Sequence, residues 1–138
     1  MTPKEFLLQV RKNETLIERK RSRIERMRRL LEYRTPPIDD LPRAGADPAE
    51  KSRALARFLA LEEEANAEIE RMVNHNRRAE YMIDSLPDPL EIKVFYMRYF
   101  DGYGWNRIAE RMGYSRQWVN EMHGRGLQRL REMYGSDL

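Results

Sequence analysis

The sequence predicts an all-α fold, in which a long antiparallel helical hairpin of the coiled-coil kind is followed by a compact helical domain. Three observations support this prediction. Apolar residues recur at helical spacing through a chain that is 36% charged. Prolines divide the first 85 residues into two long segments, and capping residues with glycine turns divide the remainder into short ones. We therefore assign residues 1–85 to the hairpin and residues 86–138 to the domain.

The first long helix is predicted over residues 3–34, because Pro3 fits a first helical turn and the next proline is Pro36. At 1.5 Å per residue it would be roughly 48 Å long. An imperfect apolar heptad repeat runs along it, with Val10, Ile17, Ile24 and Leu31 in one position and Phe6, Asn13, Lys20 and Met27 in the other.

Residues 35–47 cannot continue a helix, because they contain Pro36, Pro37, Pro42 and Gly45. Asp47 then caps a second long helix that opens at Pro48 and runs to about Ser85. Its predicted seam consists of Leu55, Leu59, Ile69, Met72, Val73, Ile83 and Leu86. Polar residues interrupt both seams, so we expect the hairpin to self-associate, as a homodimer.

Charge is segregated along the chain. Residues 11–34 contain ten Lys/Arg and four Glu, residues 39–91 contain seven Lys/Arg and thirteen acids, and residues 98–131 contain seven Arg and three acids. The order is basic, acidic, basic. This order suits a protein that offers a cationic surface to nucleic acid, although a charged surface that only contacts solvent would give the same charge pattern.

The sequence lacks the residues that several classes of protein function require. There is no cysteine, and no apolar run is long enough for a membrane span or a signal peptide, so we expect a cytoplasmic protein. The two histidines, His75 and His123, are not spaced as metal ligands, and Glu62, Glu63 and Glu64 point in different directions on a helix. Without a phosphate loop or an activated nucleophile, we expect no cofactor, no metal and no enzymatic activity.

The C-terminal third carries the sharpest signals. Asp88 and Glu91 predict a capping box around Pro89, which starts a helix that presents Leu90, Val94, Met97 and Phe100. A second helix contains Ile108, Ala109 and Met112, and a third begins at the cap Ser115 and presents Val119, Met122, Leu127 and Leu130. Gly124 and Gly126 each disfavour a helix by about 1 kcal/mol, so the sequence leaves open whether the third helix breaks after His123 or continues past Gly124.

Ala109, Gly113 and Val119 have the spacing of a helix-turn-helix: a small residue at a helix crossing, a turn glycine and a β-branched core residue. The whole stretch from Leu86 to Arg131 resembles region 4 of the sigma-70 family of RNA polymerase factors. The resemblance lies in RYFDG (98–102), IAERMG (108–113), SRQWV (115–119) and LQRLR (127–131). With the hairpin, the architecture resembles short prophage late-gene regulators of the ArpU and RinA kind.

These resemblances imply a phage or prophage transcription regulator that binds double-stranded DNA, with RNA polymerase as a further partner. Base reading would fall to the third helix, at Ser115, Arg116, Gln117, Asn120 and Glu121, whose side chains suit the edges of bases. Phosphate contacts would come from Arg107, Arg111, Arg125 and Arg129. Trp118 stands where the family often has a polar residue, and we expect it to pack in the core or at an interface.

Other readings stay open. A small terminase subunit also joins a helix-turn-helix to helical oligomerisation elements, and it binds phage DNA for packaging. A structural coiled-coil protein would have no role with DNA at all. A three-helix protein-binding module with an exposed polar helix is a third alternative.

Overall fold

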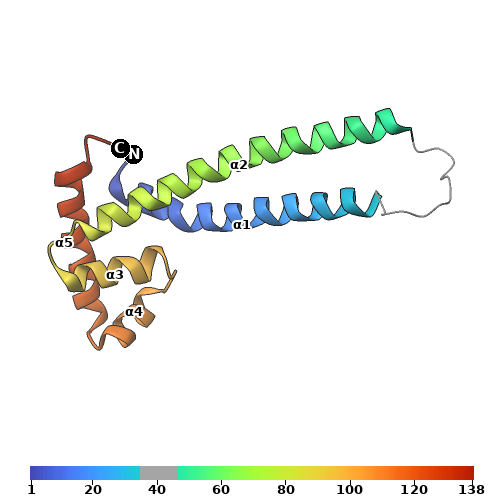
Figure 1. Ribbon diagram of the computed structural model, residues 1–138. Coiled ribbons are helices and arrows are strands. Elements are labelled where there is room, and N and C mark those ends of the chain that lie inside the picture. Colours follow the sequence, from blue (N-terminus) through green and yellow to red (C-terminus); the bar gives the residue numbers. More distant parts are fainter. Residues whose placement is uncertain (35–46) are drawn as a thin grey trace. The chain divides into compact units, whose positions relative to one another are not determined.

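The computed structural model describes residues 1–34 and 47–138, which form helices and no strand. The helices are α1 (Pro3–Arg34), α2 (Pro48–Asp84), α3 (Pro89–Tyr99), α4 (Trp105–Met112) and α5 (Arg116–Tyr134) (Figure 1). The all-α prediction is confirmed. The predicted loop over residues 35–47 lies, except for Asp47, outside the described residues. No helix within the described ranges is both long enough and apolar enough to cross a membrane.

Local sequence explains where the two long helices begin. The hydroxyl of Thr2 accepts a hydrogen bond from the backbone N–H of Glu5 (3.2 Å), and Asp47 Oδ1 accepts one from Ala49 N–H (3.0 Å). Each cap satisfies a donor that a first helical turn leaves free.

The helices are organised into two compact units. We call residues 16–72 the hairpin unit, and residues 1–15 together with residues 73–138 the core unit. The core unit therefore contains more than the predicted segment 86–138, because both chain segments that flank the hairpin unit contribute to its interior.

The interior of the core unit is formed by side chains from α1, α2, α3 and α5. Leu7 and Val10 on α1 and Ala79 and Met82 on α2 are fully buried, in one cluster with Phe95 of α3. The first turns of α1 are thus part of the hydrophobic core on which the C-terminal helices are built.

A polar contact lies beside this core. Asn13 is 4% exposed and donates to the side-chain oxygen of Asn76 (3.1 Å), whose own amide donates to the carbonyl of Val10 (3.3 Å). His75 also bonds across, with Nε2 2.9 Å from the carbonyl oxygen of Phe6, whose ring it stacks upon. The interruption that Asn13 makes in the heptad repeat is therefore satisfied by partners on α2.

The hairpin unit has a thin core. Ile17, Phe58 and Ile69 are buried, whereas the predicted seam residues Ile24 and Leu31 are only partly buried. Ion pairs join the two helices at Arg28 with Glu62 (2.7 Å) and at Lys20 with Glu68. The bond from Lys20 holds the pKa of Glu68 below its usual value.

The predicted seam of α2 is wrong in its first half. Leu55 and Leu59 are 50% and 53% exposed, and Phe58 is buried instead. Half-buried Ala54 and Ala65 lie in register with Phe58, so the inward stripe is offset from the two leucines. In the second half the prediction holds for Ile69, Ile83 and Leu86, which are buried.

Candidate nucleic-acid interface

The turn between α4 and α5 has the form that a helix-turn-helix requires. Gly113 adopts the left-handed conformation (φ 73°, ψ 27°), and its N–H bonds to the carbonyls of Ala109 and Glu110. A side chain is strained in this conformation, so glycine is the residue that ends α4 here at least cost. Ser115 then caps α5, with its hydroxyl accepting from Trp118 N–H (3.1 Å).

The two helices hold each other through the small buried cluster that the sequence predicted. Ile108 and Ala109 of α4 pack with Val119 and Met122 of α5, against Val94 of α3. Because these residues fix one side of α5, the opposite side of its first turns is left in solvent.

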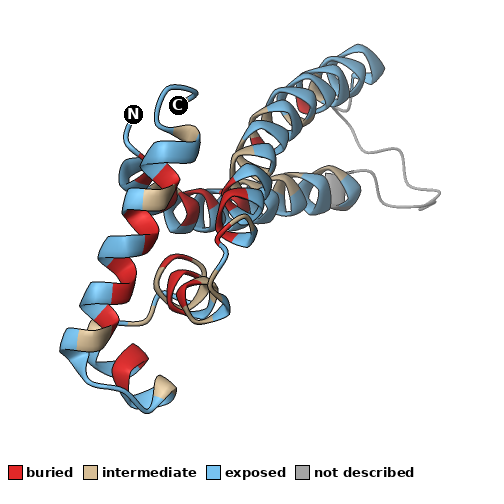
Figure 2. Cartoon of the chain, turned by 90° about the vertical axis from the view of Figure 1, so that its left-hand side faces the viewer, coloured by how far each residue is buried: buried red, intermediate tan, exposed pale blue. Residues whose placement is uncertain are grey.

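The predicted base-reading residues occupy that solvent side. Arg116, Gln117, Asn120 and Glu121 are all exposed, as is Ser115 at the cap, while Val119 between them is fully buried. The structure thus gathers Arg116, Gln117, Asn120 and Glu121 on one face at the start of α5, which carries buried residues on its other side (Figure 2). Ser115 is exposed at the cap, but its hydroxyl is bound to Trp118 N–H.

Two aromatic rings border this face. Tyr114, in the turn, is 46% exposed and stacks on Trp118 with ring centroids 3.8 Å apart and an interplanar angle of 13°. Trp118 is half-buried and packs against the small cluster. This agrees with the expected packing role of Trp118 and adds Tyr114 to the surface.

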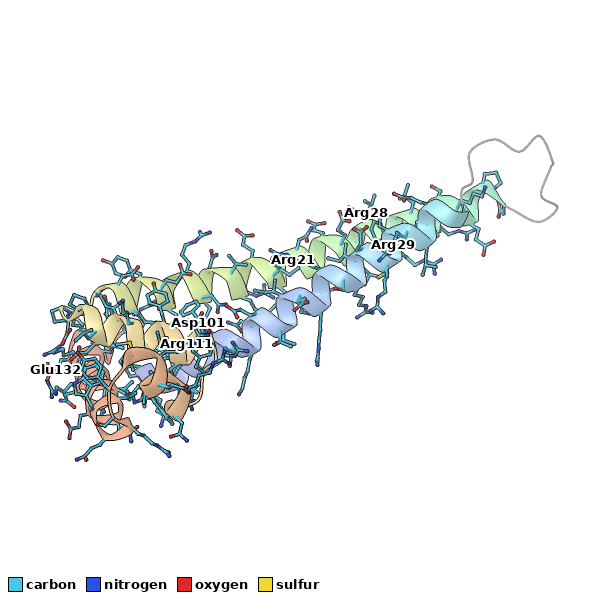
Figure 3. All side chains as sticks on the ribbon, turned by 90° about the horizontal axis from the view of Figure 1, so that it is seen from below. Arg21, Arg28, Arg29, Asp101, Arg111 and Glu132 are labelled. Carbon is cyan, nitrogen blue, oxygen red and sulfur yellow. The ribbon has the colours of Figure 1, made fainter. Side chains whose placement is uncertain are left out.

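Three arginines on α3 and α4 lie over the rings of aromatic side chains. The guanidinium carbons of Arg107 and Arg111 lie 4.1 and 4.7 Å from the ring centroid of Tyr103. Arg98 lies 4.4 Å from the centroid of Trp105 and donates to the carbonyl of Tyr103 (3.2 Å). Figure 3 labels Arg111 within this region. A flat guanidinium over an aromatic face keeps its charge and most of its donors available to an anion.

Sequence reasoning placed Arg107 and Arg111 near DNA but missed Arg98 and Tyr103. The alternation of aromatic and arginine residues from 98 to 111 was the available signal. The contacts themselves depend on the turn between α3 and α4, which residue spacing does not reveal.

The remaining two predicted phosphate contacts differ from each other. Arg125 is exposed and has no ion-pair partner among the described residues. Arg129 instead donates to both carboxylate oxygens of Glu91 (2.7 and 2.6 Å), which is 0% exposed. The predicted capping box is therefore half right: Asp88 Oδ1 caps Leu90 N–H (2.9 Å), but Glu91 turns inward to the arginine.

Gly124 and Gly126 do not break α5, because the helix runs without interruption from Arg116 to Tyr134. Gly126 is buried where α5 crosses α3, and a Cβ there would collide with the ring of Phe95. Close approach of two helices therefore explains this glycine, whereas a Cβ at Gly124 would meet open space.

His123 is buried in the core unit, which the sequence did not predict. It is 8% exposed, and its Nε2 lies 2.6 Å from the hydroxyl of Tyr99. Its ring stacks on Phe95 and meets the edge of Trp105. Burial, with Lys4 and Arg98 adding repulsion, lowers the pKa of His123 to about 4, and burial raises the pKa of Tyr99 to about 12. Neutral imidazole and neutral phenol thus form this link between α3 and α5.

No group of His, Asp and Glu within the described ranges is arranged to hold a metal ion. The chemistry of this surface is instead that of hydrogen bonding and positive charge.

Comparison with protein families gives one match, Sigma-70, region 4, over residues 83–132. The chain matches no curated protein and no solved structure. The matched residues span the end of α2, all of α3 and α4, and most of α5. They correspond closely to the stretch from Leu86 to Arg131 in which the resemblance was found. Residues 83–132 therefore form a helix-turn-helix similar to region 4 of the sigma-70 family.

Proposed function

We propose that this protein is a sequence-specific DNA-binding transcription regulator that reads the major groove with the first turns of α5. The observation that supports the proposal most strongly is a set of four exposed polar residues, Arg116, Gln117, Asn120 and Glu121, on the free side of a helix whose other side is buried. The family match supports DNA binding by this unit.

The chemistry of these four residues fits base edges. An arginine pairs with guanine through two hydrogen bonds, glutamine and asparagine pair in the same way with adenine, and a glutamate accepts from cytosine. Arg116 and Gln117 lie in the first turn of α5, which is the part of a recognition helix that reaches deepest into the groove.

Arg107, Arg111 and Arg125 are the proposed phosphate contacts. The first two are exposed on α4 and held against Tyr103, so they are ordered before DNA arrives. Arg129 is left out of this set, because its guanidinium is bound to the buried Glu91.

We further propose a phage or prophage origin, action in the host cytoplasm, RNA polymerase as a second partner, and a homodimer formed through the hairpin unit. The dimer is favoured by the thin core of that unit and by its exposed Leu30, Leu55, Leu59 and Leu61. Two copies would present two recognition helices to a two-fold symmetric operator.

Selection of bound fragments from mixed host and phage DNA tests the proposal. A regulator enriches a short sequence near promoters, and its binding weakens as salt rises. Enrichment beside a packaging site, with rings of high order, would identify a terminase subunit instead. Absence of salt-sensitive binding to any fragment would contradict a role with DNA.

A further inference from the structure

One surface of the hairpin unit carries a charge pattern that the proposed function does not use. Glu50, Arg57, Glu64 and Arg71 follow one another on α2 at intervals of seven residues, and their charges alternate in sign. Seven residues are close to two helical turns, so the four side chains form one stripe along the helix. All four are exposed, and within the described part of the chain none of them has an ion-pair partner.

An apolar groove lies beside this stripe. Leu61, between Arg57 and Glu64, is 45% exposed, and Leu30 on α1 is 62% exposed. Two adjoining pockets of about 160 and 300 Å³ run between α1 and α2 here, and both are lined by Met27, Phe58 and Leu61. The stripe and the groove thus make one surface with an apolar part and a charged edge.

The order of the charges selects one kind of occupant. If a second α2 lies antiparallel to the first, with a two-fold axis between residues 60 and 61, position 57 faces position 64 of the partner. Position 50 then faces position 71. Every glutamate of the stripe meets an arginine, four times in all, and Leu61 meets the small Ala60 of the other copy. A parallel pairing in register would instead place like charges together.

We propose that two copies of this chain associate antiparallel through this surface, which we call the α2 stripe. The exposed ion pairs add little affinity one by one, but in helical assemblies they fix orientation and register. Affinity comes from covering Leu30, Leu61 and the groove between them. A two-fold contact of this kind closes on itself, so it produces a dimer and not a filament.

This inference rests on the proposed dimer and not on DNA binding. It is therefore tested with the full chain without DNA, by sedimentation velocity across a concentration series. Arg57→Glu and Glu64→Arg each create two repulsive pairs across the axis. Each should raise the dimer dissociation constant about tenfold or more, since attraction becomes repulsion at two equivalent places.

Restoration gives the sharper result. The double variant R57E/E64R should dimerise like the original chain, and an equimolar mixture of the two single variants should form heterodimers. Positions 57 and 64 are about 10.5 Å apart along one helix, so contacts within one chain cannot produce this rescue. Glu63→Arg, which reverses an exposed charge on another side of α2, is the matched control and should leave dimerisation unchanged.

The chain has no cysteine, so Ala60→Cys introduces a single thiol beside the proposed axis. Oxidation or a short thiol crosslinker should join two such chains, while Glu63→Cys should not crosslink. A chain that stays monomeric at every concentration overturns both the dimer and the α2 stripe. If the single charge reversals leave dimerisation unchanged, or if mixing the two single variants does not restore it, the α2 stripe is not the interface although the dimer stands.

Discussion

Arg129 on α5 holds the buried carboxylate of Glu91 on α3, with one guanidinium nitrogen 2.7 and 2.6 Å from its two oxygens. Glu91 is 0% exposed, so the arginine is what makes a charged group tolerable at this place in the core unit. The pair joins the helix that supports the helix-turn-helix to the helix that carries the proposed base readers.

Removing one partner of the Arg129–Glu91 pair should lower the free energy of unfolding. Arg129→Ala leaves the carboxylate buried and unpaired, and because the arginine is itself partly exposed we expect a loss of about 2 to 3 kcal/mol in unfolding free energy. Replacing both residues by methionine should recover much of the loss. Urea unfolding measures both, with the exposed Arg125→Ala as control. Unchanged stability of Arg129→Ala, together with weaker DNA binding, would return Arg129 to the phosphate contacts.

The two glycines of α5 should respond in opposite directions to the same substitution. Gly124→Ala places its methyl group in open space and removes the helix penalty of glycine, so we expect a gain of about 0.5 to 1 kcal/mol. Gly126→Ala drives a methyl group into the ring of Phe95 and should destabilise the core unit by about 1 to 3 kcal/mol. Thermal melting compares them, and a gain in both would mean that α3 and α5 do not approach this closely.

His123 should make the core unit sensitive to mild acid. Its pKa is about 4 in the folded protein, against an ordinary value of 6.5, because it is buried near Lys4 and Arg98. As pH falls, the unfolded chain therefore binds a proton at this histidine before the folded protein does. The contribution of His123 to the free energy of unfolding is fully present above pH 6.5 and falls as pH drops toward 4. The slope from this group is up to about 1.4 kcal/mol per pH unit.

His123→Gln keeps an acceptor for the hydroxyl of Tyr99 and does not titrate. Denaturant unfolding at a series of pH values should show a smaller loss between pH 6.5 and 4 for this variant than for the original chain. Equal losses in the two proteins would show that other groups cause the acid sensitivity.

The helix bounds and the helix-turn-helix were largely predictable, because local chemistry sets them. Pro3, the pair Asp47 and Pro48, and the turn glycine Gly113 act through the backbone of their own neighbours. The buried faces of α4 and α5 followed from helical spacing, and the structure confirms Ile108, Ala109, Val119 and Leu130 as buried.

The features that the sequence did not predict correctly all depend on contacts with residues that are distant in sequence. Glu91 has the right spacing for a capping box, but its partner Arg129 is 38 positions away. Gly126 looks like a helix breaker until Phe95 is placed against it. In the hairpin unit, the spacing of Leu55 and Leu59 is as helical as that of the true inward stripe. Only packing against α1 selects Phe58.

If α5 reads base edges while arginines of α4 contact the DNA phosphates, two single variants should fail in different ways in one paired titration. Arg116→Ala and Arg111→Ala are compared on the selected site and on random DNA over a range of salt concentrations. Arg116→Ala should lose about 1 to 3 kcal/mol on the selected site and little on random DNA. Arg111→Ala should weaken both DNAs alike and lower the salt slope by about one. If Arg116→Ala kept its preference for the selected site, α5 would not be the base-reading helix, and another surface would have to recognise the sequence.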